Sequence, residues 1–188
     1  MQKALIGIIG GSGLYQMTAL QQPTEHLIDT PYGKPSDAIV SGFVHDVPVA
    51  FLARHGRGHR LIPSEVPYRA NIHAMKQMGV RYLISMSAVG SLREEIKPLD
   101  MVLPTQFIDL THQRNSSFFG NGAVAHVSMA QPICQNLADV LARAMSETRQ
   151  DEQINLYRAA VTFALKAPSF QPWQNLSGIA VCKPASSA

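Results

Sequence analysis

The chain has 188 residues, of which 46% are hydrophobic, and its 16 Lys and Arg against 13 Asp and Glu give a formal net charge of +3. This apolar content excludes a disordered chain and is sufficient for the core of one globular domain. No apolar run approaches the ~18 residues of a membrane span, and the start lacks the features of a secretory signal peptide. The two cysteines, Cys134 and Cys182, are too few for a disulfide framework, so we expect a cytoplasmic protein without membrane contact.

Short apolar runs bounded by turn-forming or charged residues predict the strands. These runs span residues 4–9, 38–44, 47–53, 81–88, 101–103 and 107–108. The pair His45-Asp46 separates the second run from the third and has the length of a tight hairpin turn. We therefore expect an antiparallel hairpin early in the chain.

Apolar residues spaced three and four apart predict a helix over residues 66–78 and another over 133–146. Pro67 suits the first turn of the first helix, and Gly79 suits its C-terminal stop. Residues 150–166 are compatible with a third helix, and the proline-interrupted stretch after them shows little periodicity. The side chains expected on the buried helix faces are Tyr68, Ile72, Met75 and Met78 in the first helix and Leu137, Val140, Leu141 and Ala144 in the second.

Strands that alternate with helices predict an α/β fold whose sheet is mostly parallel apart from the early hairpin. In open α/β sheets, ligands bind beyond the carboxyl ends of the strands. The segments that leave these strand ends are therefore the candidates for a functional site.

Gly10-Gly11-Ser12-Gly13 directly follows the first predicted strand. Glycines let a ligand approach the backbone, and consecutive N–H groups together with the Ser12 hydroxyl can bind an anion. The segment lacks the third glycine of a dinucleotide fingerprint and the Lys-Ser/Thr pair of a nucleotide P-loop. Both a plain tight turn and an anion-binding loop remain open.

Residues 54–60, Arg-His-Gly-Arg-Gly-His-Arg, follow the strand at 47–53 and form a dense basic cluster. The planar guanidinium of Arg54 suits a bidentate contact with phosphate, and His55 can donate a further hydrogen bond. His55 and His59 have the spacing of helical zinc ligands, but the glycines beside them disfavour a helix, so no metal is expected. The cluster predicts a small-anion site, with a solvated basic loop as the alternative.

Residues 85–91, Ser-Met-Ser-Ala-Val-Gly-Ser, end a third strand with small side chains. Such residues leave space and N–H donors for a ligand, although an ordinary strand-to-loop turn explains them equally well. The convergence of this segment with the glycine segment and the basic cluster in one crevice is the strongest indication of a site.

The sequence shows no arrangement of a nucleophile with its base. There is no Gly-x-Ser-x-Gly elbow, and Cys134 has no cationic neighbour in sequence, so it is interpreted as a packed thiol. His126 lies between Ala125 and Val127 and is interpreted, from these neighbours alone, as a buried histidine. The catalytic residue is therefore unknown.

Several long motifs occur in a fixed order along residues 5–146. They are Ile-Gly-Ile-Ile-Gly-Gly-Ser-Gly-Leu-Tyr, Asp-Thr-Pro-Tyr-Gly-Lys-Pro-Ser-Asp, Ala-Arg-His-Gly-Arg, Pro-Tyr-Arg-Ala-Asn-Ile, Ala-Val-Gly-Ser-Leu-Arg-Glu-Glu and Gln-Phe-Ile-Asp. With these motifs the chain resembles the methylthioadenosine phosphorylases of the purine nucleoside phosphorylase family. The resemblance implies a mixed central sheet flanked by helices.

The resemblance also implies an activity and a set of site residues. The activity is phosphorolysis of 5'-methylthioadenosine to adenine and 5-methylthioribose 1-phosphate in purine and methionine salvage. Inorganic phosphate is then the co-substrate, no cofactor is needed, and a homotrimer without nucleic-acid partners is expected. His126 matches a family histidine near the 5' side of the sugar in a neighbouring subunit's site. The implied phosphate-binding residues are Ser12, Arg54, His55, Ser87 and Ala88.

The C-terminal part departs from the family pattern. Residues 1–146 are assigned to a partial nucleoside phosphorylase-like domain, and 147–188 to a divergent, loosely ordered segment, so the fold is expected to be incomplete at its C-terminus. The family's Met-Glu-Gly-Pro motif is missing and the base-side acid is not present. The alternative is therefore a catalytically inactive remnant that binds phosphate or associates with other subunits. Nucleic-acid binding is a third hypothesis, which the scattered basic residues disfavour.

Overall fold

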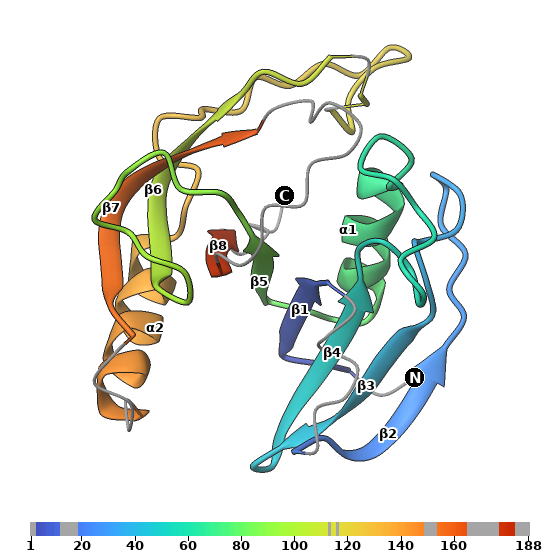
Figure 1. Cartoon of the computed structure of the whole chain (residues 1–188). Coiled ribbons are helices and arrows are strands. Elements are labelled where there is room, and N and C mark those ends of the chain that lie inside the picture. Colours follow the sequence, from blue (N-terminus) through green and yellow to red (C-terminus); the bar gives the residue numbers. More distant parts are fainter. Residues whose placement is uncertain are drawn as a thin grey trace. The chain divides into compact units, whose positions relative to one another are not determined.

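The computed structural model describes residues 3–11, 19–112, 114–115, 117–148, 154–164 and 177–182 (Figure 1). The chain divides into two compact units. The first unit consists of Met1–Ile84, Arg114–Val127 and Pro184–Ala188. The second unit consists of Ser85–Gln113 and Ser128–Lys183. Within the described ranges, no helix is long and apolar enough to cross a membrane.

The sheet of the first unit contains β1 (Ile6–Gly10), β2 (Gln21–His26), β3 (Ile39–Val44) and β4 (Val47–Ala53). The strands lie in the order β2-β3-β4-β1, with β3 antiparallel to both of its neighbours and β4 parallel to β1. The predicted first strand and hairpin are confirmed. β2 was not predicted, because Gln-Gln-Pro-Thr-Glu-His has no apolar alternation.

The turn between β3 and β4 has an unusual backbone. The φ angles of His45 and Asp46 are 45° and 64°, and Val44 pairs with Val47 directly across the turn. Positive φ at both central residues is the geometry of a type I′ turn, which continues the right-handed twist of the two strands. Residues with a Cβ are strained in this region, and glycine is not.

Replacing Asp46 with glycine is expected to stabilise the protein by about 1 kcal/mol, because this change removes the left-handed strain of one residue. The urea concentration at the unfolding midpoint measures the effect. Asp46→Ala is the matched control and should lower the midpoint, since alanine has a Cβ but no polar group for the turn. An unchanged midpoint for Asp46→Gly contradicts the strain argument.

The helix of the first unit is α1 (Tyr68–Gln77), which confirms the predicted helix. Pro67 is its N-cap residue rather than a member of the first turn, and the Tyr68 side chain is half-buried. The chain leaves the helix through Gly79, whose φ of +86° requires a residue without a Cβ. Both helix ends are thus set by residues visible in the sequence.

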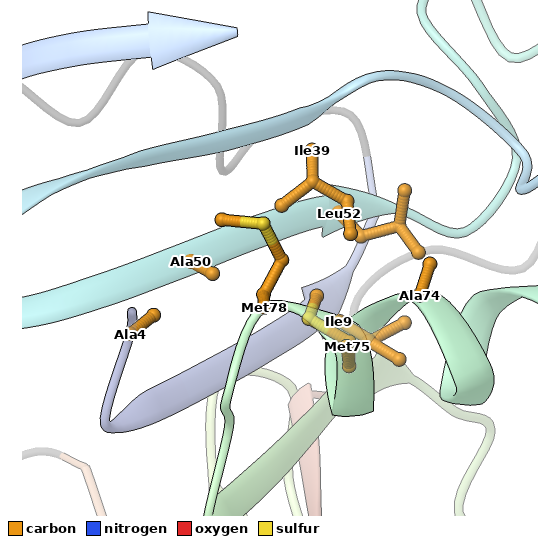
Figure 2. Close-up of a cluster of buried hydrophobic side chains, with 8 residues drawn as sticks. All are labelled: Ala4, Ile9, Ile39, Ala50, Leu52, Ala74, Met75 and Met78. Atoms are coloured by element: carbon orange, nitrogen blue, oxygen red, sulfur yellow. The ribbon is translucent and has the colours of Figure 1, made fainter. Parts of the chain in front are cut away.

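The core of the first unit joins α1 to β1, β3 and β4 (Figure 2). Met75 and Met78 are buried as predicted, but Ile72 is 38% exposed, so its placement on the buried face is wrong. Ala70 and Asn71 take its place, since short side chains allow the helix to lie close to the strands. The core cluster consists of Ala4, Ile9, Ile39, Ala50, Leu52, Ala74, Met75 and Met78.

The second unit contains β6 (Met101–Asp109), β7 (Leu156–Ala164), β8 (Ser177–Cys182) and α2 (Gln135–Thr148). β6 lies between β8 and β7 and is parallel to both. The predicted strand β5 (Tyr82–Ala88) is confirmed, and the boundary between the two units falls within it. The strand and helix content agrees with the α/β class expected from the sequence.

Several predictions for the second unit are wrong. The two short strands expected around Pro104 are one strand, whose pairing with β7 shifts register on both sides of this proline. Where a helix was expected over 150–166, Leu156–Ala164 form β7, because aromatic and β-branched residues favour a strand and this segment pairs with β6. Residues 150–153 lie outside the described residues. β8 forms where little regular structure was expected. The predictions for residues 165–176 and 183–188 lie outside the described residues.

The second helix is confirmed, but its buried face differs from the prediction. Ala138 and Ala142 are buried, whereas Val140 is 50% exposed. The observed buried face, which contains Ala138 and Ala142, is therefore rotated by about one residue from the expected face. The expected face consisted of Leu137, Val140, Leu141 and Ala144. Alanine gives a weak apolar signal, so the sequence pattern favoured the larger side chains.

Candidate functional site

The basic loop, residues 54–60, leaves the carboxyl end of β4. The backbone N–H of Arg54 donates to the carbonyl of Gly10 over 2.9 Å, which extends the parallel pairing of β4 with β1. The loop therefore begins beside Gly10, the last residue of β1, at the sheet edge where α/β proteins bind ligands. Ser12, in the glycine segment that follows β1, lies outside the described residues.

The structure brings Arg54 and His55 into direct contact. The Nε–H of Arg54 donates to His55 Nε2 over 3.2 Å, and His55 Nδ1 lies 2.8 Å from the carbonyl oxygen of Leu61. A carbonyl only accepts and a guanidinium only donates, so Nδ1 carries the proton and Nε2 offers its lone pair. His55 is thus neutral in this arrangement and orients the Arg54 guanidinium.

The local environment favours this charge distribution. Burial lowers the pKa of His55, the Leu61 hydrogen bond opposes this shift, and the positive charge of Arg54 supports it. Burial also lowers the pKa of Arg54, partly offset by the neighbouring Tyr68, but an arginine remains a cation at neutral pH. A partly desolvated cation next to a neutral histidine attracts an anion more strongly than an exposed arginine does.

The lowered pKa of His55 predicts a loss of stability in mild acid. The folded state favours the neutral ring of His55. The contribution of His55 to the free energy of unfolding is therefore present above the unfolded pKa of about 6.5 and is lost as the pH falls through the lower folded pKa. The urea midpoint of unfolding should therefore fall between pH 8 and pH 5. His55→Gln should reduce this fall. An identical pH dependence in His55→Gln contradicts the assignment.

The remaining arginines of the loop have other partners. Arg57 forms an ion pair with Glu25, at 2.7 Å between Nη1 and Oε1, and its Nε lies 3.5 Å from Asp37 Oδ1. Arg60 Nη2 donates to the backbone carbonyl of Ser36 over 2.6 Å. The basic cluster therefore divides into an orienting pair, Arg54 and His55, an exposed Arg57 paired with carboxylates, and Arg60, which is bonded to Ser36.

His59 does not complete a metal site with His55. The two rings are stacked, with centroids 4.4 Å apart and an interplanar angle of 24°. Across the ranges that the structure describes, no group of three or more His, Cys, Asp or Glu side chains is arranged to hold a metal ion. The stacked ring instead covers His55 on one side.

Ser87 and Ala88 belong to the second unit, at the end of β5. Ser87 is half-buried and Ala88 is exposed. Small residues at the carboxyl end of a strand suit the predicted role in anion binding.

His126 lies in the first unit, in a segment without regular secondary structure. Its side chain is exposed, so the interpretation as a buried histidine is wrong. The flanking Val124 and Val127 are 82% and 68% exposed. Apolar neighbours in sequence misled the residue-level interpretation, because here they too lie on the surface.

The sequence reasoning missed the residues that support the loop. Ser36, Asp37 and Asn71 are central to its hydrogen bonding, although only the resemblance drew attention to their motifs. A signal was present in the buried helix face, where Asn71 interrupts a row of small apolar residues. A buried amide needs partners, and this one finds them in Ser36.

Residues 5–172 match the model of the Phosphorylase superfamily, and the chain belongs to this superfamily. The match extends past residue 146, where the recognised motifs end, and includes β7. The chain is similar to curated S-methyl-5'-thioadenosine phosphorylases. It is 56% identical to that of Synechocystis sp. over 170 residues, which are 90% of this chain and 52% of the relative. It is 48% identical to that of Saccharolobus solfataricus over 169 residues, 90% of this chain and 61% of the relative.

Solved structures support the same family. The crystal structure of a methylthioadenosine phosphorylase sourced from an antarctic soil metagenomic library has 57% identity and a TM-score of 0.86, covering 91% of this chain and 59% of that chain. Methylthioadenosine phosphorylase from Schistosoma mansoni in apo form has 34% identity and a TM-score of 0.82. The match covers 90% of this chain and 66% of that chain. The chain spans about half the length of the first curated relatives it matches.

Proposed function

We propose that this chain carries the phosphate-binding part of a phosphorylase that converts 5'-methylthioadenosine and inorganic phosphate to adenine and 5-methylthioribose 1-phosphate. The contact between the partly buried Arg54 and neutral His55, at the carboxyl end of β4, is the observation that carries the proposal. The similarity to S-methyl-5'-thioadenosine phosphorylases supports the choice of nucleoside. The reaction serves the salvage of purines and methionine in the cytoplasm and needs no metal or cofactor.

The chemistry requires a phosphate dianion held against the sugar. Breaking the glycosidic bond places positive charge on the ribose and negative charge on the base. Phosphate fixed on one face stabilises that cation and then attacks the anomeric carbon. The guanidinium of Arg54 neutralises and orients the phosphate, and no residue of the chain is assigned as the acid that serves the leaving base.

His55 has a defined condition for contacting the phosphate. The Nε2 atom of His55 accepts a hydrogen bond from Arg54 in this structure. Nε2 can donate to an anion only after the hydrogen bond from Arg54 breaks and Nε2 gains a proton. A bound dianion favours the protonated ring, because opposite charges in close contact raise the pKa of histidine. Arg54 and His55 thus act together on the phosphate.

The other site residues complete the proposal. Ser12, Ser87 and Ala88 provide hydroxyl and backbone donors to the phosphate. His126 lines the 5' side of the sugar in a neighbouring subunit's site, within a homotrimer. The exposure of His126 supports this role, since a residue that serves another subunit must be accessible on its own chain.

Adenine release from 5'-methylthioadenosine by the purified, monodisperse chain, with and without inorganic phosphate, tests the proposed function. We expect release that depends on phosphate and yields equal amounts of adenine and sugar phosphate. Release without phosphate indicates hydrolysis and contradicts the proposal. A folded chain that binds phosphate but releases no adenine supports the alternative of an inactive phosphate-binding or subunit-associating protein.

A further inference from the structure

The basic loop is tied to α1 through a short connecting segment, Ser36-Asp37, which precedes β3. The Asp37 carboxylate accepts a hydrogen bond from the backbone N–H of Arg57, and the Ser36 carbonyl accepts from Arg60 Nη2. The Asp37 side chain is 14% exposed, and Ser36 is buried. The loop is therefore fixed at two points beyond the pair Arg54 and His55.

Ser36 is in turn fixed by Asn71 of α1. The Asn71 Oδ1 accepts from the Ser36 backbone N–H over 2.8 Å, and its Nδ2 donates to the Ser36 hydroxyl over 2.9 Å. Both residues are almost fully buried, since Asn71 is 2% exposed and Ser36 is 1% exposed. Buried polar groups with reciprocal hydrogen bonds specify one geometry, because any displacement leaves a donor or an acceptor unsatisfied.

The contact between Arg60 and Ser36 passes close to Gly56. A Cβ at Gly56 would lie 2.9 Å from Arg60 Nε and 3.1 Å from the Ser36 carbonyl oxygen, and φ at this position is +71°. Glycine is needed here for both reasons. Arg60 thus closes over the turn that directly follows His55 and holds it against Ser36.

We propose that Asn71, Ser36 and Arg60 are positioning residues that hold the turn after His55 in the conformation in which Arg54 and His55 bind phosphate. The inference rests on the proposed function, because it assigns a purpose to the same site. None of the three is assigned a contact with phosphate. They act by fixing the backbone on which the binding pair is carried.

The test compares phosphate binding by isothermal titration calorimetry in the wild-type chain, Arg60→Ala, Arg60→Lys and Ser36→Ala, with the melting temperature of each. Arg60→Ala should raise the Kd for phosphate about tenfold, as expected for one lost hydrogen bond. The melting temperature should fall by about 2–4 °C, because Arg60 donates to the carbonyl of the buried Ser36 and its removal leaves that acceptor unsatisfied. Arg60→Lys should restore most of the affinity, and Ser36→Ala, which changes no charge, should weaken binding severalfold.

Arg81→Ala is the matched control, since it removes an exposed positive charge from the first unit at a distance in sequence from the loop. Its Kd for phosphate should equal that of the wild type. Two results overturn the inference and leave the proposed function intact. One is an equal loss of phosphate affinity in Arg60→Ala and Arg81→Ala, and the other is wild-type affinity in both Arg60→Ala and Ser36→Ala. A wild-type chain that binds no phosphate overturns the proposed function, and the inference falls with it.

Discussion

Replacing Arg54 with alanine is expected to weaken phosphate binding by roughly 100-fold, because each hydrogen bond to a charged group contributes about 1.5–3 kcal/mol. Arg54 is partly buried, and its Nε–H is directed to His55, so its guanidinium has a set orientation. Arg54→Lys keeps the charge but loses the planar fork, and should weaken binding about tenfold. Calorimetric titration with inorganic phosphate measures both effects.

Arg57→Ala is the control for this prediction. It removes the same charge from the same loop, but Arg57 is exposed and forms ion pairs with Glu25 and Asp37. Exposed pairs contribute about 0–1 kcal/mol, so stability and phosphate affinity should change little. If Arg57→Ala weakens phosphate binding as much as Arg54→Ala does, the loop acts as a general positive surface rather than through an oriented pair.

Replacing Asp100 with alanine is expected to lower the free energy of unfolding by about 3 kcal/mol. Asp100 is 1% exposed, and its carboxylate accepts from the backbone N–H of Lys97 over 2.8 Å. It also accepts from the backbone N–H and the side-chain amide of Asn155, over 2.9 and 3.2 Å. Removal of the carboxylate deletes three hydrogen bonds to a charged group, each of which contributes about 1.5–3 kcal/mol, and the exposed Lys97 and Asn155 recover part of this loss from water. Urea unfolding measures the loss.

The acid dependence of stability provides the control for Asp100. Burial alone raises the pKa of this carboxyl, but the hydrogen bonds from Asn155 and Lys97 outweigh it and hold the pKa below its ordinary value of 3.8. This contribution is therefore present above about pH 4 and is lost as the pH falls through the folded pKa. Asp100→Asn should show a smaller loss of stability below pH 4. If Asp100→Asn has wild-type stability at pH 7, the ionised carboxylate is not needed.

The early part of the fold could be predicted because its signals are local. The hairpin turn at His45-Asp46 separates two apolar runs, and Pro67 and Gly79 mark the ends of α1. Arg54 and His55 are adjacent in sequence at a strand end, so their association in space follows from the strand assignment. Local chemistry of this kind needs no knowledge of distant partners.

The parts that could not be predicted depend on partners far away in the chain. Residues 156–164 suit a helix or a strand, and pairing with β6 decides for the strand. Arg57 belongs to the basic cluster in the sequence, and its ion pair with Glu25, 32 residues away, could not be predicted from that cluster. Ile72 looked like a core residue because the pattern cannot distinguish two neighbouring helix faces when the true face is lined by alanines.

The separation between Asp100 and Asn155 has a consequence for the order of folding events. These two residues are 55 positions apart, whereas two residues join β3 to β4. Closure of a long loop costs more chain entropy and delays the contacts that depend on it. We therefore expect the hairpin to form before the transition state and the Asp100 contacts to form after it. Substitutions of Asp100 should accordingly speed unfolding and leave the refolding rate almost unchanged.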